Sequence, residues 1–243
     1  MKASGAAAAV GSEQPYAVLV PVYNEAENFP RLIAEVEAVL PRPFVLYAIY
    51  DFDQDTTVPV ARELGRTRPW LRLLRNDRGP GVINALKVGF RELDSGPALV
   101  MMADLSDDLP VVERMLELYR AGARVVCASR YMKGGRQIGG PLLKGLLARL
   151  AGLSLRLLVR FPTHDATNNF RLYDAALVRE LGIESEAGFE LALELTAKAF
   201  RRGEPIAELP STWRDRTAGA SRFRLLSWLP HYLRWYRYAL VGF

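Results

Sequence analysis

The 243-residue sequence has one cysteine, two histidines and no long uninterrupted apolar run. Cys127 has no partner for an intrachain disulfide, and a single thiol with two distant histidines excludes a structural zinc site. Lys or Arg interrupts every apolar stretch before the roughly 20 residues that a transmembrane helix needs. Residues 1–14 lack the leucine-rich core of a signal peptide and are predicted to form a flexible tail. These absences favour a chain from a reducing compartment that does not cross a membrane.

Charge of either sign is unevenly distributed along the chain. The formal net charge is +5, from 32 Lys and Arg against 27 Asp and Glu. Residues 1–129 hold 14 basic and 17 acidic side chains, whereas residues 130–243 hold 18 and 10, a net charge of +8. We therefore expect the two halves to meet different partners, and no nucleic acid is expected among them.

Short apolar runs alternate with segments of helical periodicity through the first half. The expected strands are Tyr16–Val22, Phe44–Tyr50, Leu71–Arg75, Ala98–Ala103 and Val125–Ala128, and the expected helices are 25–40, 58–66, 81–93 and 109–121. Most of these strands are apolar on both faces, which predicts a Rossmann-like α/β fold with a mostly parallel sheet and helices on both faces. Ligands of such sheets bind beyond the carboxyl ends of the strands.

Polar residues cluster at those strand ends. They are Asn24, Glu25 and Glu27 after the first strand, Asp51, Asp53, Asp55 and Thr56 after the second, and Asp104, Ser106, Asp107 and Asp108 after the fourth. Helix capping is one interpretation of such residues, including Asp107 and Asp108 before Pro110. Three acids within five residues repel one another unless a cation offsets them, which favours Mg²⁺ or Mn²⁺ and a diphosphate substrate. Arg78 and the glycines beside it precede a helix, where backbone amides could face an anion.

Seven motifs occur in one order over residues 16–224. They are VPVYNEAEN (20–28), DFDQDTT (51–57), RGPGVINALKVGF (78–90), MADLSDDLP (102–110), ASRY (128–131), DATNNFRLY (165–173) and DRTAGASR (215–222). Together they resemble family 2 glycosyltransferases, most closely the dolichyl-phosphate mannose synthase-like branch. Any one of these motifs is weak, but seven in sequence are specific.

The resemblance implies a GT-A fold, a nucleotide-sugar donor, Mg²⁺ or Mn²⁺ as cofactor, and inversion at the anomeric carbon. GDP-mannose is the first expectation for the donor and a UDP-hexose the second. The donor-binding positions that it implies are Pro21, Tyr23, Glu25, Asp51, Asp53, Arg78, Ala103 and Asp104. Asp51 would contact the base or ribose.

Four positions depart from the family pattern, one of them Ser106, which stands where the family often has Gln. Met102 stands where the first acid of the Asp-Ala-Asp motif is expected, and a thioether is a poor ligand for a hard cation. Either Asp107 or Asp108 joins Asp104 in holding the metal, or metal binding is weaker than in the family. Tyr50 and Phe52 replace an acid and a glycine of the second nucleotide motif.

The resemblance also implies phosphate ligands in the basic half. Ser129, Arg130, Arg171 and Arg222 match positions that contact donor diphosphate or acceptor phosphate. Guanidinium groups suit phosphate geometry and stay charged at any working pH. Asp104, Arg130 and Arg222 are the predicted catalytic residues.

The expected acceptor is a polyprenyl phosphate. A hydroxyl acceptor would need a general base, and the corresponding segment here is Thr167-Asn168-Asn169. A phosphomonoester is largely dianionic at neutral pH and needs none. Asp165 remains either a base or the partner of a positioning arginine.

Two segments are predicted to lie on an anionic membrane surface. Residues 133–160 carry six basic and no acidic side chains within a leucine-rich helical pattern, and residues 223–243 mix tryptophan and tyrosine with arginine. A core helix with a solvated edge is the alternative for the first segment, and an interdomain or dimer contact for the second. The predicted division is a catalytic domain over 15–212 and an acceptor-loop and membrane segment over 213–243.

The sequence thus predicts a peripheral, inverting glycosyltransferase on the cytoplasmic face of a membrane, with a separate membrane subunit as an open partner. A sugar nucleotidyltransferase on a similar scaffold and a non-catalytic nucleotide-sugar-binding module are the alternatives.

Overall fold

A computed structural model describes residues 15–186, 189–215 and 225–242, with side chains from residue 229 in the last range. The elements are β1 (Tyr16–Val22), α1 (Phe29–Val39), β2 (Phe44–Tyr50), α2 (Thr57–Gly65), β3 (Leu71–Arg75), α3 (Val82–Arg91), β4 (Pro97–Val100), η1 (Leu109–Val111), α4 (Val112–Arg120), β5 (Val125–Ser129), β6 (Arg136–Ile138), α5 (Leu142–Val159), β7 (Arg171–Asp174), α6 (Ala175–Leu181), α7 (Leu191–Arg202), β8 (Ile206–Pro210), β9 (Thr212–Arg214) and α8 (Leu225–Val241). The predicted tail 1–14 and Arg222 lie outside the described residues.

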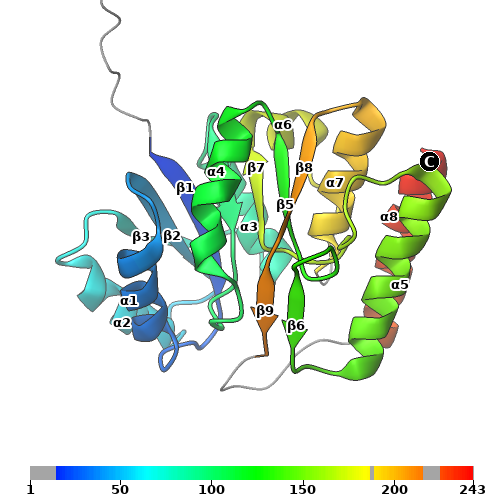
Figure 1. The fold of residues 1–243 in the computed structure, drawn as a ribbon. Coiled ribbons are helices and arrows are strands. Elements are labelled where there is room, and N and C mark those ends of the chain that lie inside the picture. The colour runs from blue at the N-terminus through cyan, green and yellow to red at the C-terminus, as the bar shows by residue number, and fades with distance from the viewer. Residues whose placement is uncertain (1–14, 187–188, 216–224, 243) are drawn as a thin grey trace, which may run out of the picture.

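A seven-stranded sheet in the order β3-β2-β1-β4-β7-β5-β8 forms the centre of the molecule (Figure 1). Every pairing within it is parallel except those of β7, which runs antiparallel between β4 and β5. The predicted mostly parallel sheet is confirmed. The insertion of β7 was not predicted from the sequence, because its first three residues end the motif DATNNFRLY, which begins with a run of polar residues.

Helices cover both faces of the sheet, as the alternation of apolar residues requires. Val18 and Val20 of β1 pack in one apolar cluster with residues of α1, α2 and α4, whereas Leu19 packs in a second with residues of α3, α6 and α7. A strand buried on both faces gives the near-continuous apolar run seen in the sequence. The predicted strands β1, β2 and β3 have the predicted bounds, while β4 ends at Val100 and α1 begins only at Phe29.

A third apolar cluster joins α5, α7 and α8 beside the sheet. Helices α5 and α8 lie side by side at one end of the sheet (Figure 1). Trp235 of α8 is 2% exposed, and its indole nitrogen donates to Ser185 Oγ at 3.1 Å. The hydroxyl of Tyr236 in α8 donates a hydrogen bond to Ser154 Oγ in α5 at 2.8 Å. The prediction that the aromatic residues of the C-terminal segment face a bilayer is therefore wrong for Trp235, because this side chain fills the space between α8 and the body of the protein.

A small parallel pair of strands, β6 and β9, extends from the end of the sheet where β1, β2 and β4 reach their carboxyl termini. Backbone bonds join this pair to both β5 and the acid-rich segment after β4. Ser211 N donates to Ser129 O at 3.0 Å, and Arg214 N donates to Ser106 O at 3.1 Å. The strands thus place the basic segment around residue 136 next to the predicted site.

Candidate active site at the carboxyl edge of the sheet

The loops that follow β1 and β2 are joined by Asp55. Asn24 has a φ of 54°, and its backbone N–H donates to both Asp55 carboxylate oxygens at 3.0 Å. Asn24 Oδ1 accepts from Thr56 N at 3.1 Å, and Glu25 N donates to Thr57 Oγ1 at 2.9 Å. Asp55 is fully buried. This carboxylate therefore builds the edge of the site and cannot contact a ligand.

Asp51 organises the loop before α3. One of its oxygens accepts from Asn76 Nδ2 at 2.7 Å and the other from Gly81 N at 2.8 Å. Asn76 also donates to Gly79 O and accepts from Arg78 N. Gly81 has a φ of 123°, which a side chain would strain. The loop bearing Arg78 is thereby held against β2. Asn76 was missed by sequence reasoning, because a single polar residue after a strand gives no distinct signal.

The other predicted donor-binding residues of this edge are accessible. Tyr23 is 39% exposed, and its ring meets that of Phe52 edge-on with centroids 5.5 Å apart. Asp53 Oδ2 lies 3.5 Å from Arg75 Nη2, and Glu25 Oε2 accepts from Asn28 Nδ2 at 2.8 Å. Pro21 lies at the end of β1. The structure brings these residues to one edge, and their contacts with a donor stay predictions.

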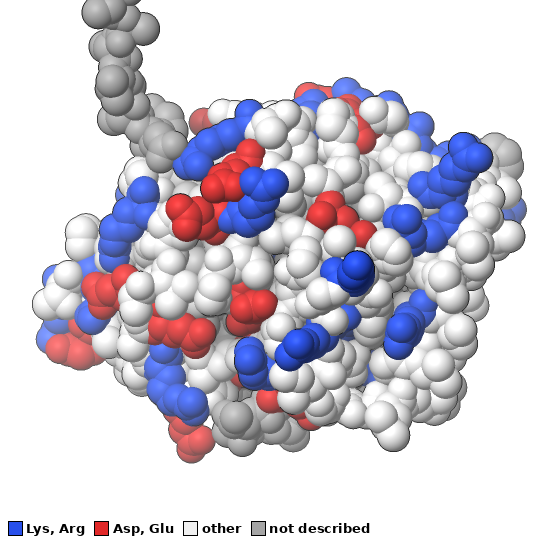
Figure 2. Space-filling model, in the orientation of Figure 1, with Lys and Arg blue, Asp and Glu red and all other residues white. Residues whose placement is uncertain are grey.

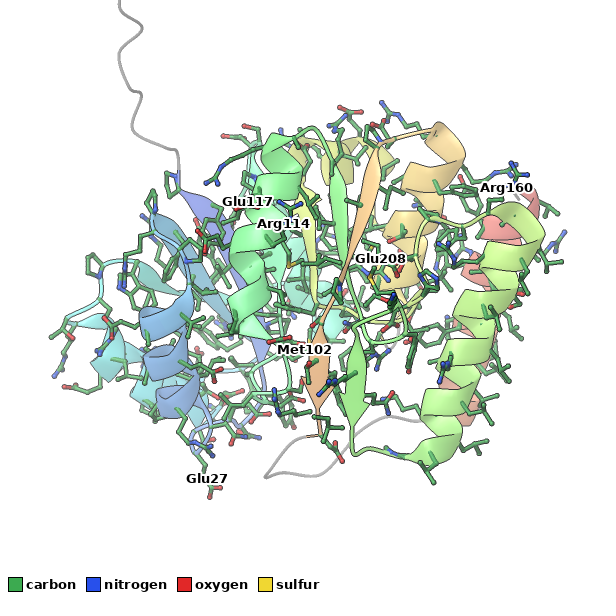
Figure 3. All side chains as sticks on the ribbon, viewed as in Figure 1. Glu27, Met102, Arg114, Glu117, Arg160 and Glu208 are labelled. Carbon is green, nitrogen blue, oxygen red and sulfur yellow. The ribbon has the colours of Figure 1, made fainter. Side chains whose placement is uncertain are left out.

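The acid-rich segment after β4 folds into a tight turn. Leu105 has a φ of 60°, and Asp104 Oδ1 accepts from Ser106 N at 3.2 Å and from Ser106 Oγ at 2.6 Å. Asp107 Oδ2 accepts from the backbone amide of Met102 at 2.9 Å. Asp107 is thus connected to the position from which the family acid is missing. Met102, labelled in Figure 3, lies near the middle of this edge, and Ala103 is buried.

Asp104 and Asp107 are suited to a divalent cation. Burial and the neighbouring Asp104 carboxylate raise the pKa of Asp107 to about 7, and the Arg130 guanidinium offsets this increase only in part. Among the described residues, no group of three or more His, Cys, Asp or Glu could hold a metal. Magnesium needs only one or two carboxylates when substrate phosphate completes the shell. Asp108 Oδ2 accepts from Thr212 N at 2.7 Å and so attaches β9 to the acid-rich turn.

Arg130 is held by Asp165 through a bidentate pair. Arg130 Nε donates to Asp165 Oδ2 at 2.6 Å, and Nη2 donates to Oδ1 at 2.8 Å. Asp165 is fully buried; burial opposes its ionisation, but the Arg130 guanidinium holds the pKa of Asp165 below its usual range. Of the two roles left open by the sequence, this geometry favours the partner of a positioning arginine.

Two predicted phosphate ligands are placed where no phosphate reaches them. Arg171 is fully buried in β7, and its guanidinium donates to the backbone oxygens of Asn168, Ala192 and Asp165. Ser129 is also fully buried, and its hydroxyl accepts from Met132 N at 3.3 Å. Both predictions are contradicted for the same reason: each residue lies on an internal strand, which the motif alone does not reveal.

A pocket of about 530 Å³ lies between Arg130, the β6 segment and the first half of α5. Three of its lining residues are Arg130, Arg136 and Arg149, and two are Leu142 and Leu146. None of the described residues that line it is acidic. In Figure 2, blue side chains gather over this region, whereas red ones lie mostly over the half that holds β1–β4. Arg136 was missed as a candidate ligand; the run of basic residues without acids was its only signal.

The protein with this sheet, acid-rich turn and adjoining basic pocket is a glycosyltransferase. The family model "Glycosyl transferase family 2" matches residues 17–182, and the chain belongs to that family.

Within the family, the chain is similar to three curated proteins whose names describe transfer of mannose to a lipid phosphate. The polyprenol monophosphomannose synthase of Mycolicibacterium smegmatis is 28% identical, with 88% of this chain and 83% of that protein covered. The dolichol-phosphate mannosyltransferase of Pyrococcus furiosus is 25% identical, with 93% and 67% covered. The undecaprenyl-phosphate mannosyltransferase of Micrococcus luteus is 28% identical, with 84% and 85% covered.

Solved structures confirm the predicted GT-A fold. Glucosyl-3-phosphoglycerate synthase from Mycobacterium tuberculosis, crystallised with Mn²⁺, UDP and phosphoglyceric acid, superposes with a TM-score of 0.66. It is 18% identical, and the match covers 95% of this chain and 78% of that one. At this identity the likeness concerns the fold.

Proposed function

We propose that this protein transfers a hexose, mannose as the first expectation, from a nucleoside-diphosphate sugar to a polyprenyl phosphate. The names of the three curated relatives support the reaction class. The observation that carries the proposal is the pocket beside Arg130, where guanidinium groups and leucines line one space. That combination suits a phosphate attached to an apolar chain.

The arginines of the pocket would hold the acceptor phosphate. Asp165 already orients Arg130, so little side-chain entropy remains to be lost when that residue binds an anion. Arg149 comes from α5, the helix that also supplies Leu142 and Leu146. The phosphate would therefore lie between Arg130 and Arg149, with the lipid chain leaving along the leucines.

Among the described residues, the site offers no general base where a hydroxyl acceptor would need one. Asn168 Nδ2 donates to Ala128 O at 2.9 Å and Asn169 Nδ2 donates to Phe189 O at 3.0 Å, so both amides serve the backbone. Asp165 is buried and paired with Arg130. A phosphate dianion can attack without losing a proton, which suits this arrangement.

The reaction would be a single displacement. An acceptor phosphate oxygen forms a bond to the anomeric carbon while the bond from that carbon to the nucleoside diphosphate breaks, which inverts the configuration. When bound, Mg²⁺ or Mn²⁺ at Asp104 and Asp107 would offset the charge of the donor diphosphate. Arg78, at the loop held by Asp51, would add positive charge on the donor side. GDP-mannose is the first donor to test and a UDP-hexose the second.

Helix α5 would place the site at a membrane surface. Eight of its leucines are exposed, from Leu142 at 90% to Leu158 at 66%, whereas Leu155 is buried against the body of the protein. Figure 2 shows the surface at this end of the molecule as mostly uncharged, with basic side chains beside it. An apolar face of this kind flanked by arginines suits the boundary of an anionic bilayer. Among the described residues, no helix is long and apolar enough to cross a membrane.

The direct test is transfer of label by the purified chain. It is incubated with radiolabelled GDP-mannose or UDP-hexoses, polyprenyl phosphate in anionic phospholipid vesicles, and Mg²⁺ or Mn²⁺, and label is counted in the organic phase. We expect metal-dependent label from GDP-mannose without any added membrane subunit. Absence of lipid product here, together with release of pyrophosphate in a parallel reaction that contains a hexose 1-phosphate and GTP or UTP, would instead indicate a nucleotidyltransferase, and donor binding without turnover a non-catalytic module.

A further inference from the structure

The segment Thr163–Asp165 follows α5 and contacts Arg130, one of the residues that line the proposed acceptor pocket, and two distant elements hold it. Its last residue, Asp165, accepts from Arg130 through both carboxylate oxygens. Arg130 also donates its backbone amide to Asp165 Oδ2 at 3.1 Å. A displacement of this segment would therefore move the Arg130 guanidinium with it.

Glu208 of β8 holds the segment from one side. Its Oε1 accepts from Thr163 Oγ1 at 2.8 Å and from His164 N at 2.5 Å, and its Oε2 lies 2.7 Å from His164 Nδ1. The Glu208 side chain is 8% exposed; burial opposes ionisation, but the hydrogen bonds from His164 and Thr163 keep the pKa of Glu208 below its usual range. Figure 3 shows Glu208 on β8, on the side of that strand nearer to α5.

Gly152 of α5 limits the segment from the other side. A Cβ built on Gly152 would lie 2.0 Å from His164 O and 2.8 Å from His164 C, far inside van der Waals contact. Gly152 has helical backbone, so the requirement for glycine comes from this close approach and not from its φ angle. Helix and segment therefore touch backbone to backbone at this one residue.

We propose that Gly152 and the His164–Glu208 pair are positioning residues that set the location of the Arg130 guanidinium in the acceptor pocket. The inference rests on the proposed function for its catalytic meaning, since Arg130 there holds the acceptor phosphate. It adds a physical link between α5, the proposed membrane helix, and the phosphate site. Gly152 and His164 touch neither substrate in this account; they act through Asp165.

The test compares variants of the full chain by two measurements. Gly152→Ala displaces the segment, and His164→Ala removes one side chain that Glu208 holds. His164→Asn places a side-chain amide nitrogen close to the position of His164 Nδ1, so that the contact with Glu208 Oε2 can form again. Ser154→Ala is the matched control on α5, because it removes the bond to Tyr236 and loosens the helix without touching the segment.

The first measurement is hydrogen–deuterium exchange at the Arg130 amide, and the second is the KM for polyprenyl phosphate against the KM for donor. We expect Gly152→Ala and His164→Ala to speed exchange and to raise the acceptor KM about tenfold, because misplacement by an ångström is costly, with donor KM unchanged. His164→Asn should restore both values, and Ser154→Ala should change neither.

The inference is overturned if Gly152→Ala matches Ser154→Ala in both measurements, or if His164→Asn fails to rescue His164→Ala. If Gly152→Ala does not fold, the comparison of His164→Ala with His164→Asn decides whether the segment positions Arg130. If the wild-type chain makes no lipid-linked sugar, the proposed function fails, whereas exchange at the Arg130 amide still decides the positioning role.

Discussion

Replacing Leu157 and Leu158 of α5 with serine should release the protein from membranes while leaving its fold intact. The two side chains are 75% and 66% exposed and lie far along α5 from the pocket residues Leu142 and Leu146. Full burial of a leucine contributes roughly 1.5–3 kcal/mol, so the exposed parts of these two contribute about 1–2 kcal/mol each in a bilayer boundary. Their loss should lower the vesicle partition coefficient roughly 30-fold to 1000-fold, since about 1.4 kcal/mol is a factor of ten.

The assay is flotation with vesicles that contain anionic phospholipid, followed by thermal unfolding of the same samples. Because both leucines are exposed, we expect the melting temperature to change little. Val39→Ser is the control: Val39 is 37% exposed on α1, away from α5, and its replacement should leave partition unchanged. Equal partition of the double variant and the wild type would refute docking by this face of α5, and an equal loss for Val39→Ser would show that the effect is not specific to it.

Three further predictions concern the site. Asp104→Asn should abolish transfer without lowering the melting temperature, and retained metal-dependent turnover would remove the metal role of Asp104. Arg149→Ala and Arg136→Ala should each raise the KM for polyprenyl phosphate about tenfold, the cost of one charge-assisted bond, with the donor KM as internal control. Because the pKa of Asp107 is raised to about 7, the folded chain binds a proton there that the unfolded chain has released, so the free energy of unfolding should fall from about pH 4 to pH 7 in metal-free buffer. Asp107→Asn should flatten that slope, and an unchanged slope in urea titrations would contradict the raised pKa.

The predicted elements were correct where a local pattern specifies them. The strands β1, β2 and β3 have the predicted bounds, and α5 lies within residues 133–160, where the leucine-rich pattern predicts a helix. Hydrophobic periodicity is a property of neighbouring residues, so the sequence contains it directly. The polar strand ends also meet at one edge as predicted, since parallel strands place their carboxyl ends together.

The roles of individual charged residues could not be predicted in the same way. Arg130 and Arg171 belong to comparable motifs, yet Arg130 lines a pocket and Arg171 is fully buried among backbone oxygens. The difference arises because β7 inserts antiparallel between β4 and β5, a pairing between segments about 45 and 75 residues apart in the chain. Likewise, Trp235 has the surroundings of a core residue because α8 packs against α5 and α7.

The sequence by itself determined the family, the order of strands and helices through the first half, the acid-rich edge of the sheet and the basic second half. Each of these depends on residue type and spacing along the chain. Only the tertiary structure decided which carboxylate pairs with which arginine, that Asp51 holds the Arg78 loop through Asn76, and that Gly152 touches the segment carrying Asp165. Such contacts join residues far apart in sequence, and their energies depend on burial and distance, which exist only once the elements have packed.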